Sequence, residues 1–162
     1  MASENLTEVY QTIEKTLHEF IQGYENAAKH NDASHVSAKL APDCKRRILP
    51  SSFFRNLGVP TDFVLDNKSY EAKFGEDLSV QGVTKTEVSH ITIDAWSKKA
   101  AATSAHTVTY IDGETYLMEI AWYLTFSEDG TQVKEIIEFI DSGDLPKFHA
   151  KCASLKEQRK EA

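Results

Sequence analysis

Four consecutive segments in the second half of the chain have the composition of β-strands, and they limit the possible folds more than any other feature. They are rich in β-branched and aromatic residues and span residues 88–96, 100–111, 115–126 and 132–141. Asp112-Gly113 and Asp129-Gly130 stand at two of the joins, and Asp-Gly is typical of hairpin turns. The four segments therefore predict antiparallel hairpins.

The first half of the chain predicts helices. From Leu6 to Ala27 apolar residues recur at every third or fourth position, which is typical of a long helix with one buried face. A short helix is expected over 33–40, ended near Pro42, and a short strand over 44–49. A loop with helical turns follows over 52–74, and a closing helix is expected over 145–157. Helices first and strands afterwards indicate an α+β fold, with helices packed on one face of a curved antiparallel sheet. A length of 162 residues suits one domain, 1–162.

Composition excludes several classes of protein. Lys and Arg total 18 against 25 Asp and Glu, a formal charge of −7, which disfavours a nucleic-acid binder because such proteins need a basic face. The sequence has no apolar run near the ~20 residues that span a bilayer, and acids stand where a secretion signal would be basic and apolar. Cys44 and Cys152 lie far apart without a metal-type spacing, so we expect reduced thiols in a cytoplasmic protein.

The strand Lys134-Glu-Ile-Ile-Glu-Phe-Ile-Asp141 carries acids on both of its faces. Because side chains alternate along a strand, Glu135 and Glu138 lie on opposite sides. If either side packs into a core, one carboxylate enters apolar surroundings, where an unpaired charge is costly. A carboxylate in that setting is typical of a general acid or base.

The register of the last hairpin decides which acid is buried. The even positions of 115–126 are large and apolar and predict the inward face: Tyr116, Met118, Ile120, Trp122, Leu124 and Phe126. A two-residue turn places Trp122 opposite Ile137 and turns Glu138 outward. A three-residue bulged loop places Trp122 opposite Ile136 and Ile120 opposite Glu138.

The preceding hairpin carries the same ambiguity. Its bulged form places His106 opposite Met118 on the inner face, and its tight form places His106 opposite Glu119 on the outer face. The residues alone leave both alternatives open.

Three stretches resemble a known family: a long helix ending in a Tyr, then DASHVSAKLAPDCKRRILP, then the strands DGETYLMEIAWYLTFSEDG and EIIEFIDS. Together they are similar to the NTF2-like superfamily, and within it to the SnoaL-like proteins of fungal natural-product pathways. The resemblance spans nearly the whole chain. It implies a cone-shaped, cystatin-like fold with an apolar pocket inside its mouth. It also implies cyclisation, isomerisation or dehydration by acid and base side chains, with neither a metal nor an organic cofactor.

Carried over by position, the resemblance implies a pocket with Glu138 of the EF-D strand, Tyr116 after the DGE turn and Arg46 of the PDC-R strand. It favours the bulged register of the last hairpin, and it implies that Tyr24 lines the pocket mouth. Arg46 and Arg47 point to opposite faces of one short strand, and we expect Arg46 to point inward.

These side chains suggest acid-base chemistry. Glu138 would serve as a general acid if unpaired and as a base if paired with Arg46, and Tyr116 would hold a reacting oxygen. His106 is a further catalytic candidate. The remaining histidines carry less weight, with His18, His30, His35 and His149 expected at the surface. The expected substrate contacts are Trp122, Met118, Ile120, Tyr24 and Phe53.

We therefore expect a cofactor-independent isomerase or cyclase that acts on an apolar polycyclic intermediate of secondary metabolism, with no metal site. The expected oligomer is a homodimer formed through the outer sheet face. A dehydratase of the same fold is one alternative, for which the family pattern of paired pocket histidines would need His106 and His90. A non-enzymatic module that binds a ligand or a protein is the other.

Overall fold

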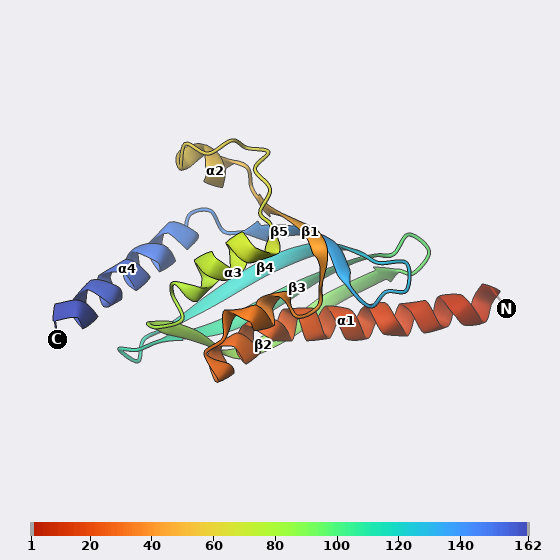
Figure 1. The fold of residues 1–162 in the computed structure, drawn as a ribbon, viewed down its shortest axis with the longest axis horizontal. Coiled ribbons are helices and arrows are strands. Elements are labelled where there is room, and N and C mark those ends of the chain that lie inside the picture. The colour runs from red at the N-terminus through yellow and green to blue at the C-terminus, as the bar shows by residue number, and fades with distance from the viewer. Residues whose placement is uncertain (1, 162) are drawn as a thin grey trace.

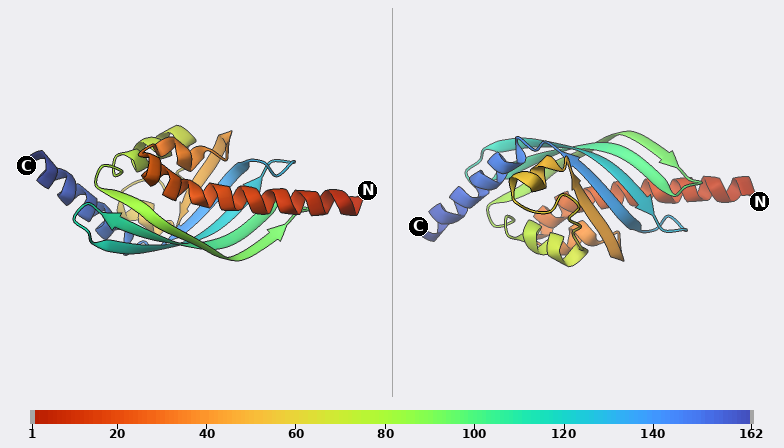
Figure 2. Two further views of the ribbon diagram at one scale, coloured as in Figure 1. Left: turned by 90° about the horizontal axis from the view of Figure 1, so that it is seen from below. Right: turned by 90° about the horizontal axis from the view of Figure 1, so that it is seen from above.

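The computed structural model describes residues 2–161. Its helices lie on one side of a curved five-stranded sheet, with the two chain ends at opposite ends of the molecule (Figures 1 and 2). The elements in chain order are α1 (Ala2–His30), η1 (Ala33–Ser37), β1 (Leu40–Leu49), α2 (Ser52–Asn56), α3 (Asn67–Gly75), β2 (Gln81–Asp94), β3 (Lys99–Tyr110), β4 (Thr115–Phe126), β5 (Val133–Ile140) and α4 (Leu145–Glu161).

The sheet has the strand order β1-β5-β4-β3-β2. Strands β2 to β5 form the predicted antiparallel meander, whereas β1 lies at the edge and pairs with β5 in parallel. The expectation of a purely antiparallel sheet is therefore corrected at this edge. Because the chain leaves β1 through α2, α3 and the whole meander before β5 forms, the two strands can run in the same direction.

Several boundaries in the first half differ from the prediction. The segment expected as a helix over 33–40 ends as a 3₁₀ helix at Ser37, capped at its start by the Asp32 side chain, which accepts a hydrogen bond from the Ser34 amide. Strand β1 begins at Leu40 and runs through Pro42, which is tolerated because β1 is an edge strand. Strand β2 begins at Gln81, earlier than the predicted residue 88.

The β3–β4 hairpin has the bulged register, with His106 opposite Met118 and Gly113 in the left-handed region at φ 87°. In the β4–β5 hairpin, neither predicted register is found. Trp122 lies opposite Glu138, and Ile120 lies opposite Ile140.

The structure gives the reason for the shifted register. Asp129 organises a longer loop, accepting hydrogen bonds from Ser127 and Thr131. The pairing is shifted by two residues from the bulged prediction, and an even shift keeps each side chain on its face. Glu138 consequently faces inward, although its predicted partner was wrong.

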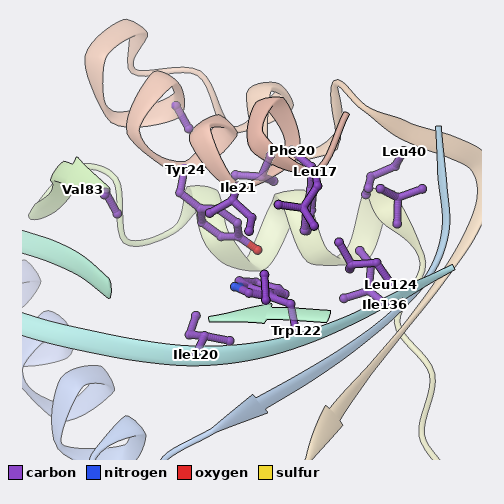
Figure 3. Packing of buried hydrophobic residues seen from close by; sticks show 14 of the residues in the cluster. Leu17, Phe20, Ile21, Tyr24, Leu40, Val83, Ile120, Trp122, Leu124 and Ile136 are labelled. Atoms are coloured by element: carbon purple, nitrogen blue, oxygen red, sulfur yellow. The ribbon is translucent and has the colours of Figure 1, made fainter. Parts of the chain in front are cut away.

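Helix α1 forms the core with the concave side of the sheet (Figure 3). From Ile13 to Ala27 its periodic apolar face is buried, as the spacing predicts, whereas near its start Leu6 is half-buried and Tyr10 is 40% exposed. On the sheet side, Trp122 is completely buried, with its ring edge-on to Phe20 at 5.3 Å between centroids. This packing fixes α1, and with it Tyr24, directly over the inner face of β4.

Helix α4 follows β5 and extends at the end of the molecule away from the N-terminus (Figure 1). Its buried residues are Phe148, Cys152 and Leu155. Phe148 packs against the rings of Tyr110 and Tyr116, and Lys156 pairs with Asp77 at 2.7 Å. Within residues 2–161, no helix is long and apolar enough to cross a membrane.

Candidate active site

A buried ion pair joins β1 to β5 on the inner face of the sheet. The Nη1 atom of Arg46 lies 2.7 Å from Oε2 of Glu138, and the two side chains are 3% and 8% exposed. The parallel register places Arg46 opposite Ile136 and Ile48 opposite Glu138, so the two charged residues stand two positions apart on one face. Arg47 is exposed, which confirms that Arg46 is the inward-pointing arginine of the strand.

Two tyrosines complete this group of side chains. Arg46 Nη1 also donates to the hydroxyl of Tyr24 at 2.8 Å, and that hydroxyl lies 2.9 Å from the hydroxyl of Tyr70. The Tyr70 ring covers the guanidinium, with its centroid 3.5 Å from Arg46 Cζ. Figure 3 shows Tyr24 reaching from α1 toward the sheet beside Trp122. We call Arg46, Glu138, Tyr24 and Tyr70 the inner cluster.

Burial sets the protonation states of the two tyrosines. Burial raises the pKa of Tyr24 to about 12, against the opposing effect of the Arg46 charge. Burial likewise raises the pKa of Tyr70 well above its ordinary value. Both hydroxyls therefore keep their protons at neutral pH and can donate hydrogen bonds.

The arginine remains a cation despite its burial. Burial acts to lower the pKa of Arg46, but the interactions with Tyr24, Tyr70 and Glu138 together outweigh burial and hold it above its ordinary value. A permanent positive charge therefore lies 2.7 Å from a carboxylate oxygen of Glu138. The inner cluster thus combines a paired carboxylate with two protonated phenols.

A second polar group lies beside the inner cluster. The indole Nε1 of Trp122 donates to Ser104 Oγ at 2.8 Å, and that oxygen lies 2.8 Å from Nε2 of His106. Nδ1 of His106 lies 3.1 Å from Thr86 Oγ1, so both ring nitrogens have partners. Burial lowers the pKa of His106 to about 4, and the imidazole is neutral at physiological pH.

The two groups meet at Tyr24, whose ring centroid lies 5.3 Å from that of His106 and 5.9 Å from that of Trp122. If Ser104 donates its hydrogen to Nε2, His106 carries its own hydrogen on Nδ1 and donates it to Thr86. The chain of hydrogen bonds then runs from Trp122 on β4 through Ser104 and His106 on β3 to Thr86 on β2. It fixes the indole that forms the floor under Tyr24.

The structure brings together some of the predicted site residues and separates others. Arg46, Glu138 and Tyr24 converge, and Trp122 and Ile120 lie buried on the same inner face. Among the described residues, no hydrogen bond or ring contact joins Tyr116 to the inner cluster. Tyr116 lies under α4 with its ring 5.8 Å from that of Phe148.

The other expected substrate contacts lie outside the inner cluster. Met118 is half-buried opposite His106, and Phe53 is buried in α2 against the ring of Phe54. Sequence reasoning missed Tyr70, because the segment 52–74 was expected to be mostly loop. It also missed Ser104, two positions from His106 on the same strand, and Thr86, whose partnership with His106 depends on the pairing of β2 with β3.

The ion pair of the inner cluster is closed to solvent, since Arg46 is 2% and Glu138 is 6% exposed, whereas Tyr70 is half-buried. Helix α3, which carries Tyr70, has no fully buried residue and is therefore the least anchored wall. Within residues 2–161, no group of three or more His, Cys, Asp or Glu side chains could hold a metal ion.

Similar folds occur among solved structures. The BvnE pinacolase from Penicillium brevicompactum superposes with a TM-score of 0.70 at 20% identity, over 90% of this chain and 94% of its own. PrhC from Penicillium brasilianum NBRC 6234 gives 0.71 at 18% identity, over 90% and 91%. An NTF2-like protein of unknown function from Burkholderia pseudomallei K96243 gives 0.57 at 12% identity, over 84% and 95%.

These likenesses show that the chain has the NTF2-like fold, as the resemblance implied. No protein-family model matches the chain, and no curated protein matches it in sequence.

Proposed function

We propose that this protein is an isomerase or cyclase of secondary metabolism that moves a proton within an apolar polycyclic substrate, using only its own side chains. The observation that carries the proposal is the buried Arg46–Glu138 pair, held by Tyr24 on the inner face of the sheet. A domain gains no stability from such a pair compared with apolar residues, so its presence suggests a chemical task. The fold shared with the BvnE pinacolase supports the same reading.

In the proposed reaction Glu138 acts as the base. Its carboxylate lies 2.7 Å from Arg46 Nη1, and it can accept a proton from the substrate and return it at another position. Tyr24 and Tyr70 are protonated because they are buried, and one hydroxyl donates to the other, so the accepting member of the pair can donate its own hydrogen to an oxygen that gains charge. No electrons leave the substrate, so the step balances without an oxidant or a reductant.

The surrounding residues would orient the substrate and exclude water. Trp122, fixed through Ser104 and His106, presents a rigid apolar surface to the reacting carbons. Because both nitrogens of His106 have partners and its pKa is low, we assign His106 to positioning Trp122. Tyr116 and Met118 would contact the substrate nearer to α4.

The dehydratase alternative has less support. The paired histidines that it needs do not converge, because His90 lies exposed at a bulge of β2 with its Nδ1 2.8 Å from Thr103 Oγ1. His106 is the only histidine described as buried within residues 2–161.

The test is to replace Glu138 by Gln in the organism that carries the gene and to compare the metabolites by mass spectrometry. Glu138→Gln should cause accumulation of an intermediate with the same mass as the missing product, because an isomerisation or cyclisation conserves every atom. The purified variant should convert that intermediate about 10² to 10⁴ times more slowly than the parent.

Glu135→Gln is the matched control, since Glu135 is an exposed glutamate of the same strand. It should leave conversion unchanged. An accumulated compound heavier by one water would favour the dehydratase, and unchanged metabolites in both strains would favour a binding module.

A further inference from the structure

A loop at the edge of the sheet exposes apolar side chains. Residues 50–64 follow the edge strand β1, and the chain returns to that strand at Leu65, whose backbone makes two hydrogen bonds, of 3.0 and 2.9 Å, with the backbone of Arg46. We call residues 50–64 the edge loop. Figure 1 shows it, with α2 inside it, standing away from the sheet and from α1. Three of its apolar residues are 61%, 42% and 37% exposed, in the order Leu57, Phe63 and Val64.

Local contacts hold these side chains at the surface. The edge loop has a small core of its own, because the buried rings of Phe53 and Phe54 lie 5.4 Å apart and the Phe63 ring lies 5.8 Å from that of Phe54. The Leu57 amide donates to the Phe54 carbonyl at 3.1 Å, and the Phe63 amide donates to the Pro60 carbonyl at 3.1 Å. Leu57 and Phe63 are both tied to Phe54, so little further ordering is needed before they contact a partner.

Charge indicates that the partner surface is neutral. Within the edge loop the only charged side chains are those of Arg55 and Asp62, which are both exposed and sum to zero. The whole chain carries a formal charge of −7, which repels an anionic surface. The contact should therefore depend on apolar burial, with little contribution from charge attraction.

Shape and area indicate which neutral partner fits. A stable protein–protein interface buries about 800 Å² on each partner, and three partly exposed side chains on a narrow loop fall well short of that area. A second copy that received the loop in a hollow would make a head-to-tail contact, which builds open chains unless it closes a ring. A lipid bilayer needs no matching hollow, because lipids move aside for apolar side chains that enter the head-group region.

We propose that the edge loop inserts Leu57, Phe63 and Val64 into the surface of a neutral lipid bilayer and holds the protein there reversibly. These side chains have about as many apolar carbons as one myristoyl chain, but they are only partly exposed. Binding is therefore weaker than the ~10⁴ M⁻¹ of a single myristoyl chain. Apolar polycyclic compounds partition into the same phase, so this contact would bring the protein to the substrate class of the proposed function, although it does not depend on that function.

Sedimentation with sucrose-loaded vesicles tests the membrane contact. The parent protein should pellet with vesicles of phosphatidylcholine alone, with a partition constant of about 10³ M⁻¹. Vesicles of phosphatidylcholine and phosphatidylserine in equal amounts should bind it no more tightly, and added salt should not release it from phosphatidylcholine. A parent protein that stays in the supernatant with both compositions, or that binds only the anionic vesicles and is released by salt, would overturn the proposal.

Matched substitutions locate the contact. Leu57→Asp should lower the partition constant about 10-fold or more, because a carboxylate would have to leave water with the loop. Ile111→Asp is the control, since Ile111 is 56% exposed at the turn between β3 and β4, outside the edge loop. It should bind vesicles as the parent does. Equal losses in the two variants, or no loss in Leu57→Asp, would show that the edge loop is not the contact.

Fluorescence measures the insertion itself and keeps the test decisive if Leu57→Asp fails to fold. Leu57→Trp is made together with Trp96→Phe, which removes the exposed indole and leaves Trp122 completely buried. Brominated phosphatidylcholine should quench the indole introduced at residue 57 and should not quench one introduced by Ile111→Trp. Equal quenching at the two positions, or none at residue 57, would overturn the proposal.

Vesicle binding and turnover are measured separately, so their failures can be told apart. A protein that converts its substrate but ignores vesicles would refute the membrane contact alone. A protein that binds vesicles through the edge loop, but whose Glu138→Gln variant keeps full turnover, would refute only the proton transfer.

Discussion

Each residue of the Arg46–Glu138 pair has a proposed function, and each would destabilise the fold if its partner were removed. Removing one partner of a buried ion pair leaves the other charge uncompensated and costs about 3–5 kcal/mol, although the intact pair need not exceed an apolar pair in stability. Tyr24 reduces this cost because its hydroxyl accepts a second hydrogen bond from Arg46 Nη1. The hydrogen bond from Arg46 to Tyr24 therefore helps to hold the buried ion pair in position.

His106 gives a pH-dependent stability that can be measured. Its pKa is about 6.5 in an unfolded chain and about 4 in the folded protein, because burial disfavours the charged imidazolium. Between pH 6.5 and pH 4, His106 therefore binds a proton in the unfolded state but not in the folded state. The free energy of unfolding should fall by up to roughly 3 kcal/mol between these two pKa values, as measured by urea denaturation at a series of pH values.

Replacing the imidazole isolates this effect. His106→Gln should flatten the decline between pH 6.5 and pH 4, whereas His18→Gln, at an exposed site on α1, should reproduce the parent curve. The ordinary carboxylates, with pKa values of about 3.9 and 4.3, titrate at the lower end of this range in all three proteins, so the difference between the curves reports the imidazole. A His106→Gln curve parallel to the parent curve would contradict the buried, neutral state assigned to the imidazole.

At the scale of elements, periodicity predicted the long helix and the four meander strands because each signal is local. The register of the β4–β5 hairpin was not predictable in the same way, because it depends on hydrogen bonds that Asp129 makes within its loop. The inward face of Glu138 was nevertheless predicted, since the faces of a strand survive an even shift in pairing. Side-chain alternation is thus a more robust prediction than pairing partners.

The packing of α1 against η1 also depends on a contact that the sequence does not reveal. A Cβ atom added at Gly23 would lie 2.5 Å from the carbonyl oxygen of His35, which is backbone and cannot rotate away. Gly23→Ala should therefore lower the free energy of unfolding by about 1–3 kcal/mol, although alanine favours an isolated helix by about 1 kcal/mol. Chemical denaturation measures the change.

Gly75→Ala is a graded comparison at the other side of the same segment. A Cβ atom there would lie 3.3 Å from the Ala33 side chain, so small adjustments can relieve the contact. We expect a change within about 1 kcal/mol of the parent. Stabilisation by Gly23→Ala would show that η1 moves freely and that the close approach does not constrain α1.

At the scale of the whole molecule, the site forms only when four distant parts of the chain meet. Arg46 and Glu138 could be predicted from the family resemblance, whereas the strand patterns alone left Glu135 and Glu138 as alternatives. Tyr70 could not, since its position over the guanidinium requires α3 to fold back against β1, and α3 has no buried face that would reveal its orientation. The sequence thus indicated the two charged residues, but not the Tyr70 ring that covers them.

The outer face of the sheet exposes several large apolar side chains. Leu117, Tyr123 and Phe139 are 58%, 54% and 47% exposed on the neighbouring strands β4 and β5. Exposed charges of both signs flank them. Arg47 lies on β1 opposite Ile137, and Glu135 lies on β5. A patch with an apolar centre and both charges at its rim can pair with a copy of itself across a two-fold axis.

We therefore expect a homodimer that buries this outer patch, formed at micromolar concentration and measurable by sedimentation velocity. Tyr123→Arg should shift the equilibrium toward monomer by at least about 10-fold, because it places like charges against each other at the two-fold axis and removes apolar contact. Trp96→Ala is the control, since Trp96 is 79% exposed at the turn between β2 and β3, outside the patch. A monomeric parent, or a dimer that tolerates Tyr123→Arg unchanged, would show that this face does not hold two copies together, while the inner cluster would remain complete within each chain.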